Sequence, residues 1–325
     1  MKAGLLLAAS VAAIAFVPAA AGAEDFPVRP VRLLVPFAPG GNTDILARAV
    51  GPKLTEKWGK PVVVDNRPGG AGIIACETVA RATPDGHTLL VASTGEVAVN
   101  PSLFKNLPYD VARDFAPITL GTVSPLLLVR HPSLAVRNVK ELIEAAKAKP
   151  RAVAYASVGI GSPMHLSGEL FKMVTHTDLV HVPYKGGAPA TAALLGGQEA
   201  QTGFVGMGPV LPHVKAGRLH ALAISTAKRS PLLPQVPTFR ELGYPEVETH
   251  AWFGFFLPAG SPKEAVSRIH LDVKRVLDEP DFRQKQLIDK GYEVVGSAPD
   301  EFAAYIRKDS ESRARAVKIS GAKAE

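Results

Sequence analysis

The stretch VRLLVPFAPGGNTDILAR, from Val31 to Arg48, decides the fold. It opens with a short continuous apolar run, turns at Pro39-Gly40-Gly41, and continues with residues at helical spacing. A continuous apolar run of this length is typical of a strand buried on both faces of a parallel sheet. The stretch therefore predicts a strand, a bare glycine turn and a helix.

The same alternation of strand and helix continues along the chain. Seven more strand-like runs follow: PVVVDNR, TLLVAS, PLLLVR, AVAYASV, LVHVPY, AQTGFV and HALAIS. Two helix starts carry a capping residue with Glu three positions later, Asn138 with Glu141 and Ser261 with Glu264. Strands alternating with helices predict an α/β fold with open, helix-covered sheets, and 325 residues are enough for two such domains.

The first 23 residues have the layout of a secretory signal peptide. Lys2 precedes an apolar run from Leu5 to Val17, and small residues lead to a cleavage site after Ala23. This run is too short to span a bilayer comfortably. We therefore expect export to the periplasm with removal of residues 1–23.

Composition argues against several other classes of protein. The formal charge is +7, but the cations are scattered and no basic stripe with interleaved aromatic residues occurs, so no nucleic-acid partner is expected. The single cysteine, Cys76, can form neither an internal disulfide nor a cysteine metal cluster, and several histidines fall on separate elements. The sequence predicts no metal and no cofactor.

Four predicted strands end in turns rich in Gly, Ser and Thr: PFAPGGNTD, ASTGEVAVNP, ASVGIGSPMH and PYKGGAPA. Ligands of open α/β sheets bind beyond the carboxyl ends of the strands. Glycine lets a backbone approach a ligand closely, and N–H groups at helix N-termini favour carboxylate or phosphate. One such turn alone is ordinary architecture, but four, two in each half, predict a cleft that binds an anion. The absence of a GxxxxGK[ST] phosphate loop favours a carboxylate.

Ser162 lies three residues before His165, which invites a catalytic interpretation. No GxSxG nucleophile elbow occurs, and no positioned acid follows to complete a triad. A helix-capping role for Ser162 and a pocket-wall or ligand-donor role for His165 are the simpler interpretations. Asp44 and Glu96 are the carboxylates nearest the predicted cleft. Asp44 is suited to cap the first helix, whereas Glu96 is costly in an anion site unless it meets a cation or lies outside it.

The chain resembles the periplasmic substrate-binding proteins of tripartite tricarboxylate transporters, also called Bug-type receptors, from about Phe26 to the C-terminus. The similarity lies in an ordered series of blocks: VPFAPGGNTDILAR, PVVVDNRPGGAG, ATPDGHTLL, NLPYDVARDFAPIT, HLSGELFK, HVPYKGGAPA, LPHVKAGRLHALA, TAKRSP, VPTFRELG and WFGFFLPAGSP. The resemblance implies a type II periplasmic-binding-protein fold, in which two doubly wound α/β domains joined by crossing strands close on a ligand. On this basis we expect residues 24–124 and 252–325 to form domain 1 and residues 125–251 to form domain 2.

The resemblance also implies a small organic carboxylate as ligand, held by backbone amides, hydroxyls and water. By motif position, the ligand-binding residues would be Phe37, Ala38, Pro39, Gly40, Gly41, Thr43, Ser93, Thr94, Ser157, Gly159, Gly161, Ser162, His165 and Val205. Two positions depart from the family. Val205 stands where an acidic residue is frequent, and Glu96 stands where a small or apolar residue is usual, which puts the identity of the ligand in doubt.

These features predict a monomeric, non-enzymatic receptor that delivers a carboxylate to the membrane permease of a tripartite transporter. Two alternatives stay open at the level of sequence. One is a periplasmic sensor that presents its ligand state to a signalling receptor. The other is an enzyme acting on a carboxylate through Ser162 and His165.

Overall fold

The computed structural model describes residues 26–324, so the predicted signal peptide lies outside the described residues. Within them the strands pair in the order β2-β1-β3-β9-β4-β7-β5-β6, and β8 and β10 both pair with β4. The strands are β1 (Val31–Val35), β2 (Val62–Asn66), β3 (Thr88–Ser93), β4 (Phe115–Arg130), β5 (Ala154–Ser157), β6 (Val180–Pro183), β7 (Thr202–Gly206), β8 (His220–Ile224), β9 (His250–Pro258) and β10 (Glu293–Val294).

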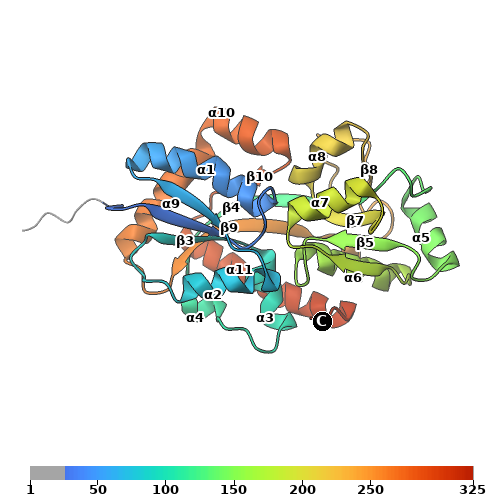
Figure 1. Cartoon of the computed structure of the whole chain (residues 1–325), viewed down its shortest axis with the longest axis horizontal. Coiled ribbons are helices and arrows are strands. Elements are labelled where there is room, and N and C mark those ends of the chain that lie inside the picture. Colours follow the sequence, from blue (N-terminus) through green and yellow to red (C-terminus); the bar gives the residue numbers. More distant parts are fainter. Residues whose placement is uncertain (1–25, 325) are drawn as a thin grey trace, which may run out of the picture.

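Helices cover this sheet on both faces (Figure 1). The α-helices are α1 (Asn42–Trp58), α2 (Ile73–Ala80), α3 (Asn100–Leu103), α4 (Val111–Asp114), α5 (Val139–Ala148), α6 (Pro163–Thr175), α7 (Gly187–Gly196), α8 (Met207–Lys215), α9 (Lys263–Asp278), α10 (Pro280–Phe282) and α11 (Pro299–Ser320). Shorter helical segments are η1 (Gly70–Gly72), η2 (Gly95–Val99), η3 (Pro245–Val247), η4 (Arg283–Leu287) and η5 (Ile288–Lys290). No helix in residues 26–324 has both the length and the apolar character needed to cross a membrane.

The long strand β4 is shared by two halves of the molecule. Its residues 115–125 pair with β9, and its residues 126–130 pair with β7. We call lobe 1 the half with β1, β2, β3, β9 and β10, and lobe 2 the half with β5, β6, β7 and β8. In Figure 1 the blue start of the chain lies with β9 and α9 in lobe 1, and the green and yellow middle forms lobe 2. This arrangement confirms the predicted two-domain α/β fold class.

Burial on both faces explains the continuous apolar pattern of β1. The side chains of Leu33 and Val35 belong to one core cluster with α1 and α9. The side chain of Leu34 belongs to a second cluster with α2 and α11 on the opposite face. Because successive side chains of a strand point to opposite faces, both faces need apolar residues. The turn after β1 is thereby carried to the edge of lobe 1 that faces lobe 2.

One of the two predicted side-chain caps forms. The Asn138 side chain accepts a hydrogen bond from the Glu141 amide at 2.9 Å, as predicted. The prediction for Ser261 was wrong: α9 begins at Lys263 without a side-chain cap, and the Ser261 hydroxyl donates instead to the carbonyl of Pro258 at 2.8 Å. The helix begins one residue later than the pattern predicts, and its N-cap position is taken by Pro262, whose side chain cannot accept a hydrogen bond.

Candidate ligand-binding site

A narrow cavity lies between the lobes, beyond the carboxyl ends of the parallel strands. Its volume is about 30 Å³, enough for about two water molecules. Its walls come from turns and helix starts of both lobes and from β9. The lining residues are Phe37, Gly41, Asn42, Thr43, Ser93, Val158, Pro163, Met164, Gly187, Thr191, Val205, Gly206, Pro209, Ala251 and Phe253.

Four helices present their N-termini to this cavity: α1 from lobe 1, and α6, α7 and α8 from lobe 2. None of the helices α1, α7 and α8 has a side-chain cap at its N-terminus. The backbone amides of Asn42, Thr43 and Gly187 donate to no acceptor within residues 26–324. Unpaired amides and helix dipoles give the cavity a positive potential that favours a negatively charged group.

Glycines allow the two lobes to meet closely at these helix starts. A Cβ atom on Gly41 would lie 3.3 Å from the Gly187 nitrogen, and a Cβ on Gly187 would lie 3.0 Å from the Gly41 Cα atom. The amide of Ala38 also donates to the carbonyl of Lys185 across the gap at 3.1 Å. Side chains at either glycine would push the lobes apart.

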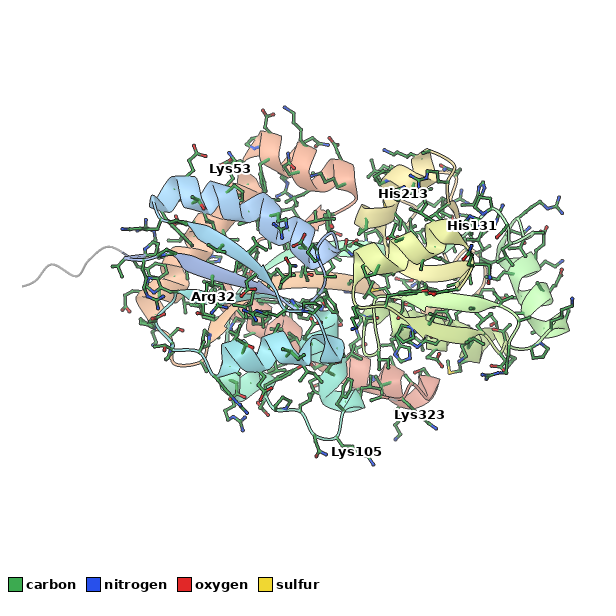
Figure 2. All side chains as sticks on the ribbon, in the orientation of Figure 1. Arg32, Lys53, Lys105, His131, His213 and Lys323 are labelled. Carbon is green, nitrogen blue, oxygen red and sulfur yellow. The ribbon has the colours of Figure 1, made fainter. Side chains whose placement is uncertain are left out.

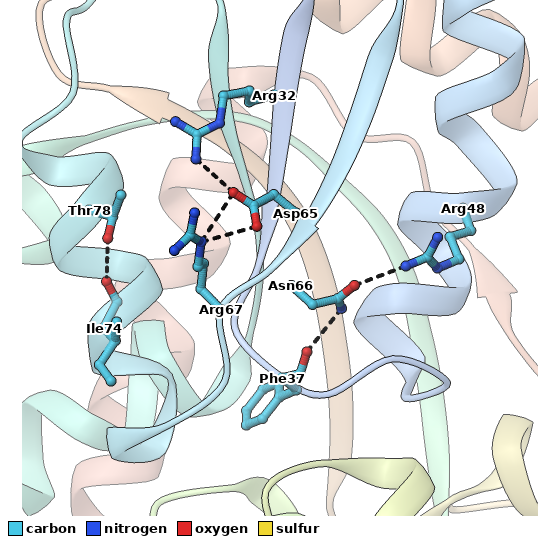
Figure 3. Close-up of polar contacts among 8 residues, drawn as sticks. All are labelled: Arg32, Phe37, Arg48, Asp65, Asn66, Arg67, Ile74 and Thr78. Carbon is cyan, nitrogen blue, oxygen red and sulfur yellow. Dashed lines mark hydrogen bonds and ion pairs between the residues drawn. The ribbon is translucent and has the colours of Figure 1, made fainter.

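The first turn is held in place by Asp44. Its carboxylate accepts hydrogen bonds from the Gly40 amide at 2.8 Å, from Arg48 at 2.9 Å and from Asn66 at 2.9 Å. The Asn66 side chain also donates to the Phe37 carbonyl at 3.0 Å and accepts from Arg48 (Figure 3). Asp44 therefore fixes the turn through Gly40 and is balanced by Arg48, which leaves the next amides of α1 unpaired.

Two threonines bring hydroxyl groups to the cavity wall. Thr43 comes from α1 and Thr191 from α7. The Thr191 hydroxyl is buried and has no hydrogen-bond partner in the described part of the chain. Val205 makes the adjoining wall apolar. Because buried polar groups are normally paired, the Thr191 hydroxyl is suited to a ligand.

Behind the cavity wall, Ser93 is bonded to the fully buried Glu96. The Ser93 amide and hydroxyl both donate to Oε2 of Glu96, at 2.7 and 2.8 Å. Burial raises the pKa of the Glu96 carboxyl to about 7. The neighbouring Thr94 has a structural role, because its hydroxyl accepts from the Trp252 amide at 2.9 Å.

Several residues predicted for the site lie off this cavity. Ser157 points its hydroxyl to Nε2 of His181 at 2.7 Å, and the ring of His181 stacks on that of His165 at 4.3 Å. Burial, followed by the charges of His165 and Lys172, lowers the pKa of His181 to about 3. His165 and His181 line a separate polar pocket of lobe 2. Pro39 is exposed, and no polar contact joins it to the cavity.

The 159–162 turn belongs to the contact between the lobes. The carbonyl of Gly161 lies 3.2 Å from where a Cβ of Gly95 would stand. The Ser162 hydroxyl donates to the Gly159 carbonyl at 2.6 Å and accepts from the His165 amide at 3.1 Å, so it caps α6. Nδ1 of His165 accepts from the Gly161 amide at 3.3 Å, and the Ser162 proton goes to the Gly159 carbonyl.

A side pocket of about 250 Å³ adjoins the cavity and shares Phe37 and Val158 with it. One wall is the 69–72 loop, in which Ala71 has a positive φ of 56°. We did not predict this loop as part of the site, although its run of glycines, PGGAG, was a signal. Met164, Thr191 and Phe253 were also missed, because nothing in their local sequence distinguishes them from core residues.

Within residues 26–324, no cluster of histidine, cysteine, aspartate or glutamate is arranged to hold a metal ion. The basic side chains labelled in Figure 2, such as Lys53, Lys105 and His213, lie apart from one another around the outside of the molecule. The remaining feature is an anion-favouring cavity between two α/β domains that share a strand. This combination defines a solute-binding protein of the periplasmic-binding-protein type.

Comparison with known proteins identifies the family. Residues 46–321 match the model of the tripartite tricarboxylate transporter family receptor, and the chain belongs to this family. It is 36% identical to Protein BugT of Bordetella pertussis over 96% of this chain and 95% of that protein.

Two solved structures are similar in sequence and fold. The structure of R. palustris Rpa4515 with adipate has a TM-score of 0.88 and 36% identity, covering 91% of this chain and 99% of that one. MatC from Rhodopseudomonas palustris, with bound malate, has a TM-score of 0.86 and 33% identity, covering 90% and 100%. The fold is thus that of the predicted type II binding proteins, and the similar proteins are binding receptors.

Proposed function

We propose that this protein is a periplasmic receptor that captures a small organic carboxylate between its lobes and delivers it to the permease of a tripartite tricarboxylate-type transporter. The observation that carries the proposal is the convergence of four helix N-termini on one cavity, with unpaired amides at Asn42, Thr43 and Gly187. The adipate and malate named for two similar structures are both carboxylates, which supports the same ligand class.

We propose that the lobes separate to admit the ligand and then close around it, since the cavity of about 30 Å³ has room for only about two water molecules. We propose the boundaries given above, residues 24–124 with 252–325 and residues 125–251, as the two bodies that move. Binding shifts the equilibrium toward the closed state only by the ligand's extra affinity for that state.

Calorimetry with matched acids and amides tests this function. Succinate, glutarate and adipate are compared with their uncharged diamides, which keep the carbon chain and remove the charge. We expect at least one acid to bind while its diamide does not, and we expect the radius of gyration to fall when that acid is added. Binding of neutral sugars but of no acid would contradict the proposal.

A further inference from the structure

Glu96 is a buried acid placed directly behind the ligand cavity. Its side chain is 0% exposed, and its Oε2 atom accepts both hydrogen bonds offered by Ser93. The other oxygen, Oε1, has no hydrogen-bond partner in the described residues. It packs on Gly72, where a Cβ atom would lie only 2.8 Å away. A half-paired carboxyl beside an anion-favouring cavity is costly for the fold and calls for a functional reason.

No cation among residues 26–324 pairs with this carboxyl. Tyr109 donates its hydroxyl to the backbone carbonyl of Glu96 at 2.7 Å, not to the side chain. Cys76 of α2 is a buried thiol, and burial together with the Glu96 charge raises its pKa. On α11, which packs against η2, the buried Asp309 and Arg313 pair with each other at 3.2 Å. Glu96 therefore acts on its surroundings mainly through Ser93.

The hydrogen bond to Glu96 determines what Ser93 offers to the cavity. A serine hydroxyl has one proton and two acceptor lone pairs. Its proton is directed to Glu96 at 2.8 Å, and the Gly95 amide donates to its oxygen at 3.3 Å. Ser93 still lines the cavity, so with Glu96 ionised its hydroxyl oxygen can accept a further hydrogen bond but has no proton to donate.

We propose that Glu96 is a positioning residue that sets ligand specificity: by holding the Ser93 proton, it makes the cavity prefer an organic acid that carries a hydroxyl or ammonium donor over the plain acid of the same length. This inference rests on the proposed function. The helix N-termini receive the carboxylate, and the Ser93 oxygen accepts from the donor. A plain acid leaves that oxygen unpaired or turns a carboxylate toward it, and both are unfavourable.

The preference depends on the charge of Glu96. With a pKa raised to about 7 by burial, the carboxyl is ionised above neutral pH and largely neutral below it. A neutral carboxyl holds the Ser93 proton less strongly, because hydrogen bonds to charged groups are the stronger ones. The preference for donor-bearing acids therefore grows as pH rises through about 7, and plain acids bind with uptake of a proton.

The test compares binding constants within matched series at about pH 6 and about pH 8, where the probes themselves change charge little. The series are succinate, malate and aspartate, and glutarate, 2-hydroxyglutarate and glutamate. In the series that binds, we compare the affinity of the donor-bearing acid with that of the plain acid, which carries no hydroxyl or ammonium group. We expect this affinity ratio to be about ten or more at about pH 8 and to be smaller at about pH 6.

Three variants separate this role from a general effect on the fold. Ser93→Ala is expected to bring the affinity ratio close to one at both pH values. Glu96→Gln is expected to remove the pH dependence of the affinity ratio. Asp272→Asn is the matched control, because Asp272 is equally buried but neither of its hydrogen-bond partners, Trp58 and Arg268, lines the cavity, and the affinity ratio of this variant should stay that of the wild type.

A wild-type ratio close to one, a ratio unchanged in Ser93→Ala, or a pH dependence that persists in Glu96→Gln overturns the inference and leaves the proposed function intact. If Glu96→Gln does not fold, the wild-type pH profile and Ser93→Ala still decide. Binding by no acid of either series overturns the proposed function and this inference together.

Discussion

Two buried carboxylates of lobe 1 have contrasting surroundings. Asp272 of α9 accepts from the indole of Trp58 at 2.8 Å and from Arg268 at 2.6 Å, and Lys57 lies 3.4 Å from its other oxygen. Glu96, behind the cavity, meets no cation in the described chain, and its Oε1, like the Oδ1 of Asp272, accepts no hydrogen bond there. Both side chains are 0% exposed, and their partners differ.

The partners give the two acids opposite effects on stability. Burial opposes ionisation of both carboxyls. At Asp272 the hydrogen bonds from Trp58 and Arg268 outweigh burial and lower the pKa, whereas at Glu96 burial has the larger effect and raises the pKa. Asp272 therefore stabilises the fold at neutral pH, and this contribution is lost as pH falls through its lowered pKa. Glu96 stabilises the fold only while protonated, and its contribution is lost as pH rises from 4.5 through about 7. A buried acid surrounded by cations supports the fold, and a buried acid that meets no cation beside a cavity is suited to act on a ligand.

The largest expected effect is on Asp272. Asp272→Ala should lower the free energy of unfolding at neutral pH by about 3 kcal/mol, because it leaves the Trp58 indole without its acceptor and the cations around it without a counter-charge. Asp278→Ala removes an exposed carboxylate from the same helix and should change stability by about 0.5 kcal/mol or less. Chemical denaturation measures the free energy of unfolding of both variants. An equal loss of stability in the two variants would contradict the proposed role of Asp272.

Glu96→Gln should act in the opposite direction. At about pH 8 the variant should be more stable than the wild type by about 2 kcal/mol, because it removes a charge that burial disfavours, and at about pH 4 the two should be equal. Denaturation curves across this pH range check the sign. A gain that is the same at every pH would show that the charge of Glu96 is not its cause.

The smallest expected effect concerns a neutral group at the same cavity. Thr191→Val should leave stability nearly unchanged and weaken binding of the preferred acid by about 1 kcal/mol, about fivefold in affinity, because its unpaired hydroxyl is expected to meet the ligand. Thr78→Val is the matched control, since Thr78 bonds only the Ile74 carbonyl on the exposed face of α2 (Figure 3). Equal affinities of the two variants for the acid, measured by calorimetry, would show that Thr191 does not bind the ligand.

The sequence was informative wherever structure is set by neighbours along the chain. The apolar run of β1, the glycine turn and α1 were predicted from one stretch, and the Asn138 cap from a four-residue pattern. The Ser261 cap failed because α9 begins one residue later than the pattern predicts, which puts Pro262 at the N-cap position. Local patterns place a helix start only to within a residue or two.

The site was less predictable because its chemistry depends on contacts between distant elements. Ser157 is bonded to His181, 24 residues later, and this contact turns it away from the interlobe cavity. Glu96 was noted as unusual, but the packing of Oε1 on Gly72 became visible only in the fold. A glycine turn predicts where a ligand can approach, and it does not say which polar atoms remain unpaired there.

A crystal structure with an acid that calorimetry shows to bind tests the central claim most directly. We expect a carboxylate group in the interlobe cavity that accepts hydrogen bonds from the amides of Asn42 or Thr43 on one lobe and of Gly187 on the other. An acid bound elsewhere, or in the cavity with those three amides turned to other acceptors, would contradict the account.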